Sequence, residues 1–263
     1  MIPVLGTLIV NGINWLEKQI NSIDFPVDNY LIIDNNAKGE NTNNIQRLIS
    51  KPHKFIKNIK LATMPYNIGI AAGWNMIIKS YVNSPYWIIA NNDVSFCKGF
   101  LKEMYEKSQD EKIGLVFGNG GDFGLGSFDL FLIKDFVVQS HGFFDENFYP
   151  AYCEDADYIM KLHNSPVPTI YNLDKNYYHG DGIMGKGNDH DYYKTGMQTK
   201  RLDPELEKKL SFANEKNFEY MNEKWGKGWR NVEPYKYPFN IKELDSRVSV
   251  LDLNYYRNKY TGF

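Results

Sequence analysis

Apolar residues follow two different spacings in the first 117 positions of the chain. Short continuous apolar runs are typical of strands that are buried on both faces. Such runs predict strands at residues 4–10, 30–33, 59–63, 86–90 and 113–117. The stretches between them repeat apolar residues every three or four positions, which is the pattern of a helix that buries one face.

The first helical stretch is predicted to begin at Asn14, a residue type that caps helices, with Glu17 as its capping-box partner. Further helices are expected around residues 43–50, 71–81 and 100–108. This alternation of strands and helices predicts an α/β fold, with an open, mostly parallel sheet and helices on both of its faces.

Polar residues directly follow three of the predicted strands. The three clusters are Asn11-Gly12, Asp34-Asn35-Asn36 and Asn91-Asn92-Asp93. In open parallel sheets, ligands bind beyond the carboxyl ends of the strands. We therefore expect the functional site to lie where these clusters meet.

The pattern changes after residue 117. Residues 118–126 hold five glycines but no Gly-Lys-Ser/Thr, which excludes a Walker phosphate loop. A mobile loop and a loop shaped around a ligand are both compatible with this composition. A strand is expected at 128–133, a short helix ending near Leu162, and a charged helix between Arg201 and Trp225.

Composition narrows the possible classes of protein. The 263 residues are 43% hydrophobic and 15% aromatic, which excludes a disordered chain and suits one large domain or a domain with an appendage. The net charge of −2 supplies no basic field for DNA or RNA. Two cysteines, Cys97 and Cys153, are too few for a disulfide scaffold and for most zinc modules.

No stretch of the sequence contains the roughly 20 apolar residues that cross a bilayer. The apolar N-terminus lacks the basic region and the cleavage site of a signal peptide, so we interpret it as a buried strand. We expect a cytoplasmic protein, either free or held peripherally at a membrane.

Several acidic residues and one histidine are candidates for chemistry. Asp93 is either a turn residue or an oxygen ligand of a divalent cation whose coordination substrate phosphates complete. Glu154, Asp155 and Asp157 either favour a helix start through the helix dipole or include a functional carboxylate. His179 is either a surface histidine or a metal ligand.

Taken together, these clusters form an ordered set of motifs. In chain order the segments are Ile32-Ile-Asp-Asn-Asn36, Asn67-Ile-Gly-Ile-Ala-Ala-Gly-Trp-Asn75, Asn91-Asn-Asp93, Gly142-Phe-Phe-Asp-Glu-Asn-Phe148, Glu154-Asp-Ala-Asp157 and Lys224-Trp-Gly226. Over most of its length the chain resembles the inverting, nucleotide-sugar-dependent glycosyltransferases of family 2. The downstream His179 is similar to that of the rhamnosyltransferase-like and galactofuranosyltransferase-like members.

The resemblance implies a GT-A, Rossmann-like fold. It implies a glycosyltransferase domain at residues 1–200, with a nucleotide-binding half at 1–117 and an acceptor half at 118–200. Residues 201–263 would be a helical and irregular C-terminal extension packed on the core. The expected partners are a UDP-, dTDP- or GDP-sugar donor and a glycan or other hydroxyl acceptor.

The resemblance also implies roles for single residues. Asp155 would be the general base, with Glu154 as a neighbour that could exchange roles with it, and Asp93 with His179 would hold Mn²⁺ or Mg²⁺. The residues implied in donor binding are Ile9 through its backbone, Asp34, Asn67, Asn75 and Asn92.

Two departures from the family motifs leave other functions open. Asn91 replaces the first acidic residue of the metal motif, and Trp74 replaces the usual Arg or Gly. A catalytically inactive nucleotide- or sugar-binding protein is therefore the main alternative. A nucleotidyltransferase would need a Gly-rich loop with a basic residue after the first strand, and residues 10–15 contain no basic residue.

Overall fold

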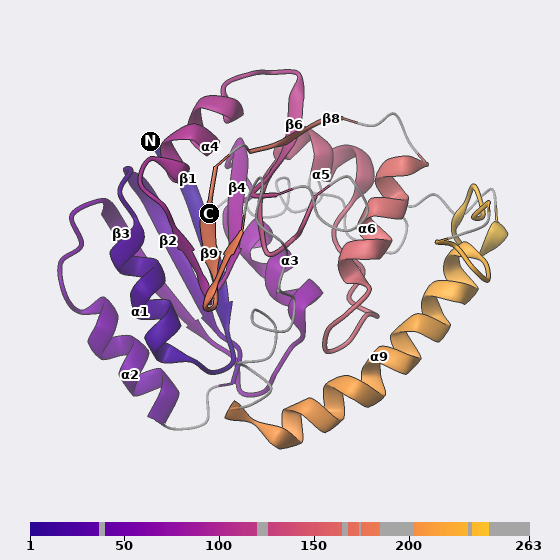
Figure 1. Ribbon diagram of the computed structural model, residues 1–263, viewed down its shortest axis with the longest axis horizontal. Helices are drawn as coiled ribbons and strands as arrows, with labels where there is room; N and C mark the ends of the chain where they lie inside the picture. The colour runs from indigo at the N-terminus through magenta and orange to yellow at the C-terminus, as the bar shows by residue number, and fades with distance from the viewer. Residues whose placement is uncertain are drawn as a thin grey trace, which may run out of the picture.

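Figure 1 shows the computed structural model, which describes residues 1–36, 40–119, 126–164, 168–173, 175–184, 202–230 and 233–241. Within these residues a seven-stranded sheet has the order β3-β2-β1-β4-β7-β6-β8. Its strands are β1 (Ile2–Ile9), β2 (Val27–Asp34), β3 (Ile56–Thr63), β4 (Tyr86–Asn91), β6 (Ile113–Phe117), β7 (Leu130–Lys134) and β8 (Thr169–Asn172). A smaller sheet contains β5 (Val94–Phe96), β9 (Tyr177–His179) and β10 (Gly182–Met184).

The large sheet is mostly parallel, as predicted. β1 runs parallel to β2 and β4, and β2 to β3, whereas β7 runs antiparallel between β4 and β6. Because β2 and β4 lie on opposite sides of β1, the order of the strands reverses at β1. Such a reversal opens a crevice at the carboxyl ends of the strands, where open α/β sheets bind ligands.

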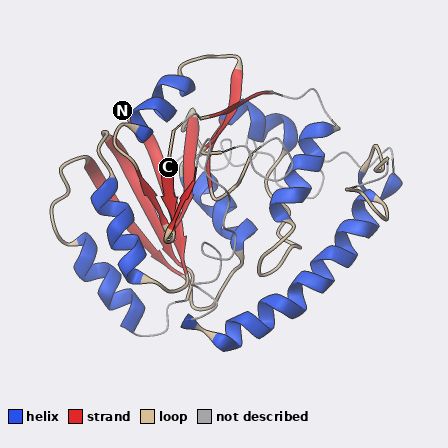
Figure 2. Cartoon of the chain, in the orientation of Figure 1, coloured by secondary structure: helices blue, strands red, loops and turns tan. Residues whose placement is uncertain are grey.

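Helices cover both faces of the sheet, which confirms the predicted α/β fold (Figure 2). One face carries α1 (Ile13–Ser22), α2 (Glu40–Ile49) and α4 (Phe100–Ser108), and the other carries α3 (Ile70–Ser80), α5 (Asp135–His141) and α6 (Glu154–His163). The strands are buried on both sides because successive side chains point to opposite faces. In β4, Ile88 packs with the first group of helices and Trp87 and Ile89 with the second.

One predicted helix start was wrong. Gly12, not Asn14, is the N-cap of α1, and it adopts a left-handed conformation with φ 81°. Glycine adopts this conformation at little cost, so the chain turns from β1 into α1 two residues earlier than the polar pattern indicates. Residues 120–125 of the predicted glycine-rich loop lie outside the described residues.

The helix α9 (Pro204–Trp225) forms the described part of the C-terminal extension. It begins at Asp203, whose Oδ1 accepts a hydrogen bond from the Leu206 backbone at 3.0 Å. Figure 1 shows it at the rim of the molecule, on the side of α6. The predicted boundary at residues 200 and 201 lies outside the described residues, and the division into two halves stays a prediction. No described helix is long and apolar enough to cross a membrane.

A buried cation fixes α9 to the core. Lys224 Nζ lies 2.6 Å from Asp145 Oδ2 and 2.7 Å from Asp157 Oδ1, and all three side chains are at most 3% exposed. Burial by itself would raise the pKa of Asp145, but the charge of Lys224 lowers it to about 2. Trp225 Nε1 also donates to Asp157 Oδ1, at 2.8 Å. The docking of α9 therefore depends on matched charges as well as on apolar packing.

We predict that Lys224→Met lowers the free energy of unfolding by about 3–5 kcal/mol, because it leaves two carboxylates buried without this counter-charge. Lys208→Met, on the exposed side of α9, should cost less than about 0.5 kcal/mol. Urea unfolding measures both. The pKa of Asp145 is lowered in the folded state, so its contribution is present above the ordinary pKa and is lost as the pH falls toward about 2. The difference in unfolding free energy between the parent and Lys224→Met should therefore shrink as the pH falls over that range. Equal losses of unfolding free energy in Lys224→Met and Lys208→Met would contradict the buried pair.

Candidate active site

A cavity of about 380 Å³ lies where β1 and β4 end and β7 begins. Six of the predicted site residues line it: Asn67, Asn92, Asp93, Glu154, Asp155 and His179. They come from widely separated parts of the chain, so the fold brings together what the sequence only suggested.

The turn that carries Asp93 is held by a buried side chain of α1. Gln19 Nε2 donates to the carbonyl oxygens of Asn91, at 2.7 Å, and Val94, at 3.0 Å. The Tyr30 hydroxyl donates in turn to Gln19 Oε1 at 2.5 Å. These bonds fix the backbone on both sides of Asp93, so that its carboxylate reaches the cavity from a rigid turn.

The small sheet brings His179 to Asp93. β9 pairs antiparallel with β5, which places His179 opposite Val94, and the Gly180 backbone donates to the Asp93 carbonyl at 2.8 Å. As a result, His179 Nε2 lies 3.2 Å from Asp93 Oδ1, while Nδ1 lies 3.1 Å from Asp129 Oδ2. The imidazole ring is thus held between two carboxylates.

Asp129 is a site residue that the sequence prediction missed. It precedes β7, which runs antiparallel to β4, so the start of β7 lies at the edge where β4 ends. The Asn91 backbone donates to the Asp129 carbonyl at 2.8 Å, and the Tyr177 hydroxyl donates to Asp129 Oδ2 at 2.6 Å. An acidic residue inside the apolar run 128–133 was the signal that could have revealed it.

The two carboxylates keep His179 protonated when no cation is bound. Burial alone would lower the pKa of His179, but the charge of Asp93 and hydrogen bonds to Asp129 and Asp93 raise it to about 10. Burial would likewise raise the pKa of Asp129, yet its hydrogen bond to His179 and the charge of that ring lower it. Asp129 is therefore ionised although it is buried.

The same side chains suit a divalent cation. Two neighbouring ligands of an octahedral ion lie about 3.0 Å apart when each bond is about 2.1 Å. The 3.2 Å between Asp93 Oδ1 and His179 Nε2 is close to that separation. Asp129 on Nδ1 orients the ring, as carboxylates commonly do for metal-bound histidines. The described residues contain no group of three such ligands, so phosphate or water oxygens would have to complete the coordination.

Two carboxyl groups at the start of α6 face the cavity with different properties. Glu154 is 6% exposed, and burial, followed by the charge of Asp155, raises its pKa well above the ordinary value. Glu154 Oε2 has no hydrogen-bond partner among the described residues. Asp155 is half-buried and accepts a hydrogen bond from the Ala156 backbone at 2.7 Å. The pair places a carboxyl group with a raised pKa beside a candidate base.

Asn67 and Asn92 line the cavity through ordered loops. Asn67 Oδ1 accepts hydrogen bonds from Asn35 Nδ2, at 2.9 Å, and from the Gly69 backbone, at 2.8 Å. Asn92 Nδ2 donates to the Asn11 carbonyl at 3.0 Å. The Asn92 contact connects the polar clusters that follow β1 and β4, and the Asn35 contact connects the cluster after β2 to the loop that leads into α3.

Asp34 does not appear among the described lining residues of the cavity. Its fully buried carboxylate accepts hydrogen bonds from the Asn36 backbone at 3.3 Å, Asn41 Nδ2 at 3.1 Å and Thr42 Oγ1 at 2.5 Å. These contacts tie the end of β2 to the first turn of α2. The carboxylate is thereby used within the protein rather than presented to the cavity.

Asn75 and Ile9 also lie behind the cavity wall. Asn75 Nδ2 donates to the Phe144 carbonyl and to Glu146 Oε1, both at 2.8 Å, and its Oδ1 accepts from the Phe144 backbone at 2.9 Å. The Ile9 side chain is in the core, and its carbonyl accepts from the Asn35 backbone at 2.8 Å. Their neighbours Trp74 and Val10 line the cavity instead.

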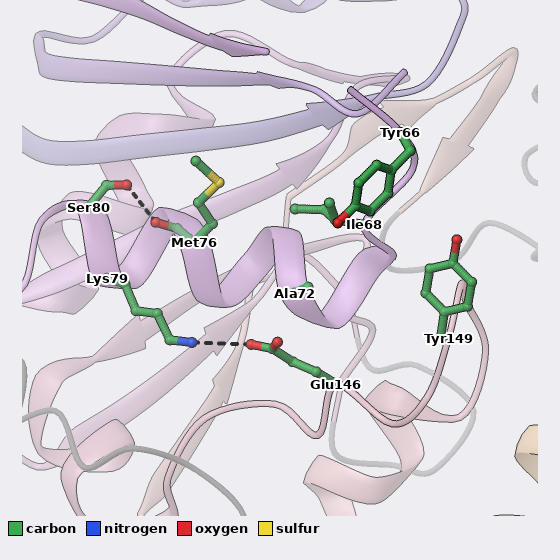
Figure 3. A pocket seen from close by; sticks show the side chains of 8 residues that line it. All are labelled: Tyr66, Ile68, Ala72, Met76, Lys79, Ser80, Glu146 and Tyr149. Atoms are coloured by element: carbon green, nitrogen blue, oxygen red, sulfur yellow. Dashed lines mark hydrogen bonds and ion pairs between the residues drawn. The ribbon is translucent and has the colours of Figure 1, made fainter. Parts of the chain in front are cut away.

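Two further cavities adjoin or approach this one. A cavity of about 590 Å³ shares Val10, Asn67, Pro150 and Leu206 with the candidate site and extends it toward Tyr66. A groove of about 650 Å³ follows α3, and Figure 3 shows its lining, with the Lys79–Glu146 ion pair at 3.2 Å. None of the predicted site residues lines the groove in Figure 3, so its larger volume does not make it the centre of the chemistry.

Neither protein-family models nor curated proteins give a match to the chain. Among solved structures, the mannosyltransferase PcManGT from Pyrobaculum calidifontis, in complex with GDP-Man and Mn²⁺, is 12% identical over 65% of this chain and 54% of its own, with a TM-score of 0.53. TarS of S. aureus (residues 1–349) in complex with UDP-GlcNAc is 15% identical over 72% of this chain and 60% of its own, also at 0.53.

At these identities the likeness shows the fold alone. The predicted fold class is confirmed, because the chain has the α/β fold of these glycosyltransferases. The chain covers between about half and three-fifths of the length of those two structures.

The raised pKa of Glu154 leads to a testable pH dependence. Its pKa is raised in the folded state, so its contribution to stability is present below the unfolded-state pKa of 4.5 and is lost as the pH rises through the folded-state pKa. At about pH 4.5, Glu154→Gln should have nearly the melting temperature of the parent. At higher pH it should be increasingly more stable than the parent, and the difference in unfolding free energy should grow by at most about 1.4 kcal/mol per pH unit. Glu215→Gln, on the exposed side of α9, should follow the parent. Parallel melting curves for Glu154→Gln and the parent would show that Glu154 is ionised in the fold.

Proposed function

We propose that the protein is a glycosyltransferase that moves a sugar from a nucleotide-sugar donor to a hydroxyl group, with inversion and with the help of a divalent cation. One observation carries the proposal: a single cavity combines the Asp93–His179 pair, which suits a cation, with the carboxylate of Asp155 beside the buried Glu154. The fold shared with structures bound to GDP-Man and UDP-GlcNAc supports it.

The donor half of the site would bind the diphosphate. Displacement of a nucleoside diphosphate places negative charge on phosphate oxygens, and a cation held by Asp93 and His179 would neutralise it. Mn²⁺ and Mg²⁺ both take oxygen ligands of this kind. Asn67 and Asn92 would donate hydrogen bonds to the ribose or the diphosphate from the same wall.

The nucleoside would occupy the adjoining cavity, which Val10, Asn36 and Tyr66 line. Asp34 lies two residues before Asn36 and hydrogen-bonds to its backbone. We therefore propose that Asp34, Ile9 and Asn75 serve donor binding through the loops that they hold. The choice among UDP-, dTDP- and GDP-sugars would depend on this cavity.

The acceptor half would activate a hydroxyl group. A hydroxyl is a poor nucleophile, so a carboxylate must take its proton as the bond to the anomeric carbon forms. Asp155 fits this role, whereas burial and the charge of Asp155 raise the pKa of Glu154, which favours its protonated form. Attack from the face opposite the leaving group inverts the anomeric centre in one step. The protonated Glu154 could donate a hydrogen bond to a sugar hydroxyl.

A catalytically inactive nucleotide- or sugar-binding protein is the second candidate. The observation that favours it is the pairing of Asp93 with a protonated His179, in a motif where Asn91 replaces an acidic residue. Calorimetry with nucleotide sugars, combined with a product assay, separates the two functions. Binding without turnover for every donor and acceptor would favour the inactive protein.

The role of Asp155 gives the first prediction for the proposed reaction. Asp155→Asn should lower turnover by about 10²–10⁴-fold and leave donor affinity nearly unchanged, because the base acts on the acceptor in the transition state. Glu154→Gln should retain most of its turnover, since an amide resembles the protonated carboxyl in size and in its ability to donate. A dead Glu154→Gln together with an active Asp155→Asn would assign the base to Glu154.

The role of Asp129 gives the second prediction for the proposed reaction. Asp129→Ala should weaken Mn²⁺ binding, measured by electron paramagnetic resonance with a nucleoside diphosphate present, by about 10–100-fold. If Asp129 acts through His179, the double variant with His179→Ala should bind Mn²⁺ no more weakly than His179→Ala alone. Additive losses would mean that Asp129 acts independently of His179, and nucleotide binding that is equal in EDTA and in Mn²⁺ would argue against the cation.

A further inference from the structure

The buried face of α9 contains two polar residues. Its buried positions recur every three or four residues and consist mainly of Leu206, Leu210, Ala213, Asn217, Met221 and Lys224. A buried polar group costs free energy unless it is hydrogen-bonded, so a face that only packs would be apolar throughout. Asn217 and Lys224 therefore mark contacts that do more than bury surface.

Asn217 contacts the segment that leads into α6. Its Nδ2 donates to the carbonyl oxygen of Ala151 at 2.8 Å and to that of Tyr152 at 3.0 Å, and the residue is only 4% exposed. A single amide group thus binds two consecutive carbonyls and restricts the rotation of both peptide planes. Ala151 and Tyr152 themselves line the candidate active site.

The segment that Asn217 holds has a strained backbone. Tyr152 and Cys153 have φ values of 78° and 75°, in the left-handed region that residues with side chains rarely adopt. Two such residues in succession persist only where the surrounding structure holds them. Asp155 follows two positions after Cys153, so this conformation sets the direction in which α6 presents its carboxylate.

α9 also holds the chain on the other side of Asp155. Lys224 Nζ and Trp225 Nε1 both contact Asp157 Oδ1, at 2.7 Å and 2.8 Å. The contacts before and after Asp155 therefore come from one continuous helix, which Figure 1 shows beside α6. A helix is stiff over this length, so the two sets of contacts fix the first turn of α6 together.

We infer that α9 holds residues 151–157 in a fixed position and that Asn217 is a positioning residue for Asp155. The inference rests on the proposed function, in which Asp155 is the general base. Asn217 is not among the described lining residues of the cavity, so it would act through Ala151 and Tyr152. Because a base must lie within hydrogen-bond reach of the acceptor hydroxyl, a displacement of about 1 Å can cost about 100-fold in rate.

The test compares Asn217→Leu with Asn214→Leu in the full-length protein. Both variants replace an asparagine of α9 by a residue of similar size, but Asn214 is exposed. For Asn217→Leu we expect faster amide hydrogen exchange at residues 151–155, a turnover about 10–100-fold lower, and a donor dissociation constant within about twofold of the parent. Asn217→Ser can still donate one hydrogen bond, so its exchange rate and turnover should lie between those of the parent and Asn217→Leu. Asn214→Leu should match the parent in all three measurements.

Three outcomes would overturn the inference. The first is unchanged exchange at residues 151–155 in Asn217→Leu. The second is faster exchange with turnover that stays within about twofold of the parent, which would make the contact structural only. The third is a loss of donor affinity as large as the loss of turnover, which would indicate general disruption. A parent that transfers no sugar from any donor would overturn the proposed function and, with it, the positioning role of Asn217, while the exchange measurement would still decide whether α9 holds residues 151–155.

Discussion

The position of α9 depends on one buried cation, the ammonium group of Lys224 between Asp145 and Asp157. Removing three charged groups from water is costly, and only close, well-oriented pairing offsets that cost. The pairing is therefore satisfied in one arrangement of α9 against α6 and against the turn that contains Asp145. Because the chain between Asp145 and Asp157 forms a wall of the cavity, the position of α9 and the shape of the site are determined together.

The cluster of Asp93, His179 and Asp129 also depends on buried charges that satisfy one another. His179 satisfies Asp93 and Asp129 when no cation is present, and the pairing of β5 with β9 gives the ring little freedom to move. A divalent ion would replace the proton on Nε2 without a rearrangement of the backbone. In the proposed function the Asp93–His179 pair would exchange its proton for an ion, whereas the Lys224 pairs are almost inaccessible to solvent and would stay paired.

The sequence predicted those features that depend on local pattern. Buried strands and their polar ends placed Asn92 and Asp93 at one edge, because parallel strands end together, whereas Asn67 was implied only by the resemblance to the family. An acidic residue inside the apolar run 128–133 marked Asp129, but the sequence could not place it at this edge, because the antiparallel direction of β7 is set by tertiary pairing and not by the spacing of its residues. The sequence also could not tell that Asp34 and Asn75, which match the family motifs, turn their polar groups toward α2 and the Phe144 backbone, since a motif gives identity and not orientation.

Orientation also changes the meaning of Asn91. In the family that the sequence resembles, an acidic residue is usual at this position, so the sequence alone indicates a loss of charge. In the fold, Asn91 lies opposite Asp129 across the antiparallel pair of β4 and β7, and its backbone donates to the Asp129 carbonyl. A carboxylate at position 91 would add a third negative charge beside Asp93 and Asp129. Among the described residues, the cation that contacts both Asp93 and Asp129 is the protonated His179. Repulsion among buried like charges would oppose that arrangement. The asparagine is therefore compatible with a working cation site, because the second carboxylate enters from the neighbouring strand and acts on the histidine.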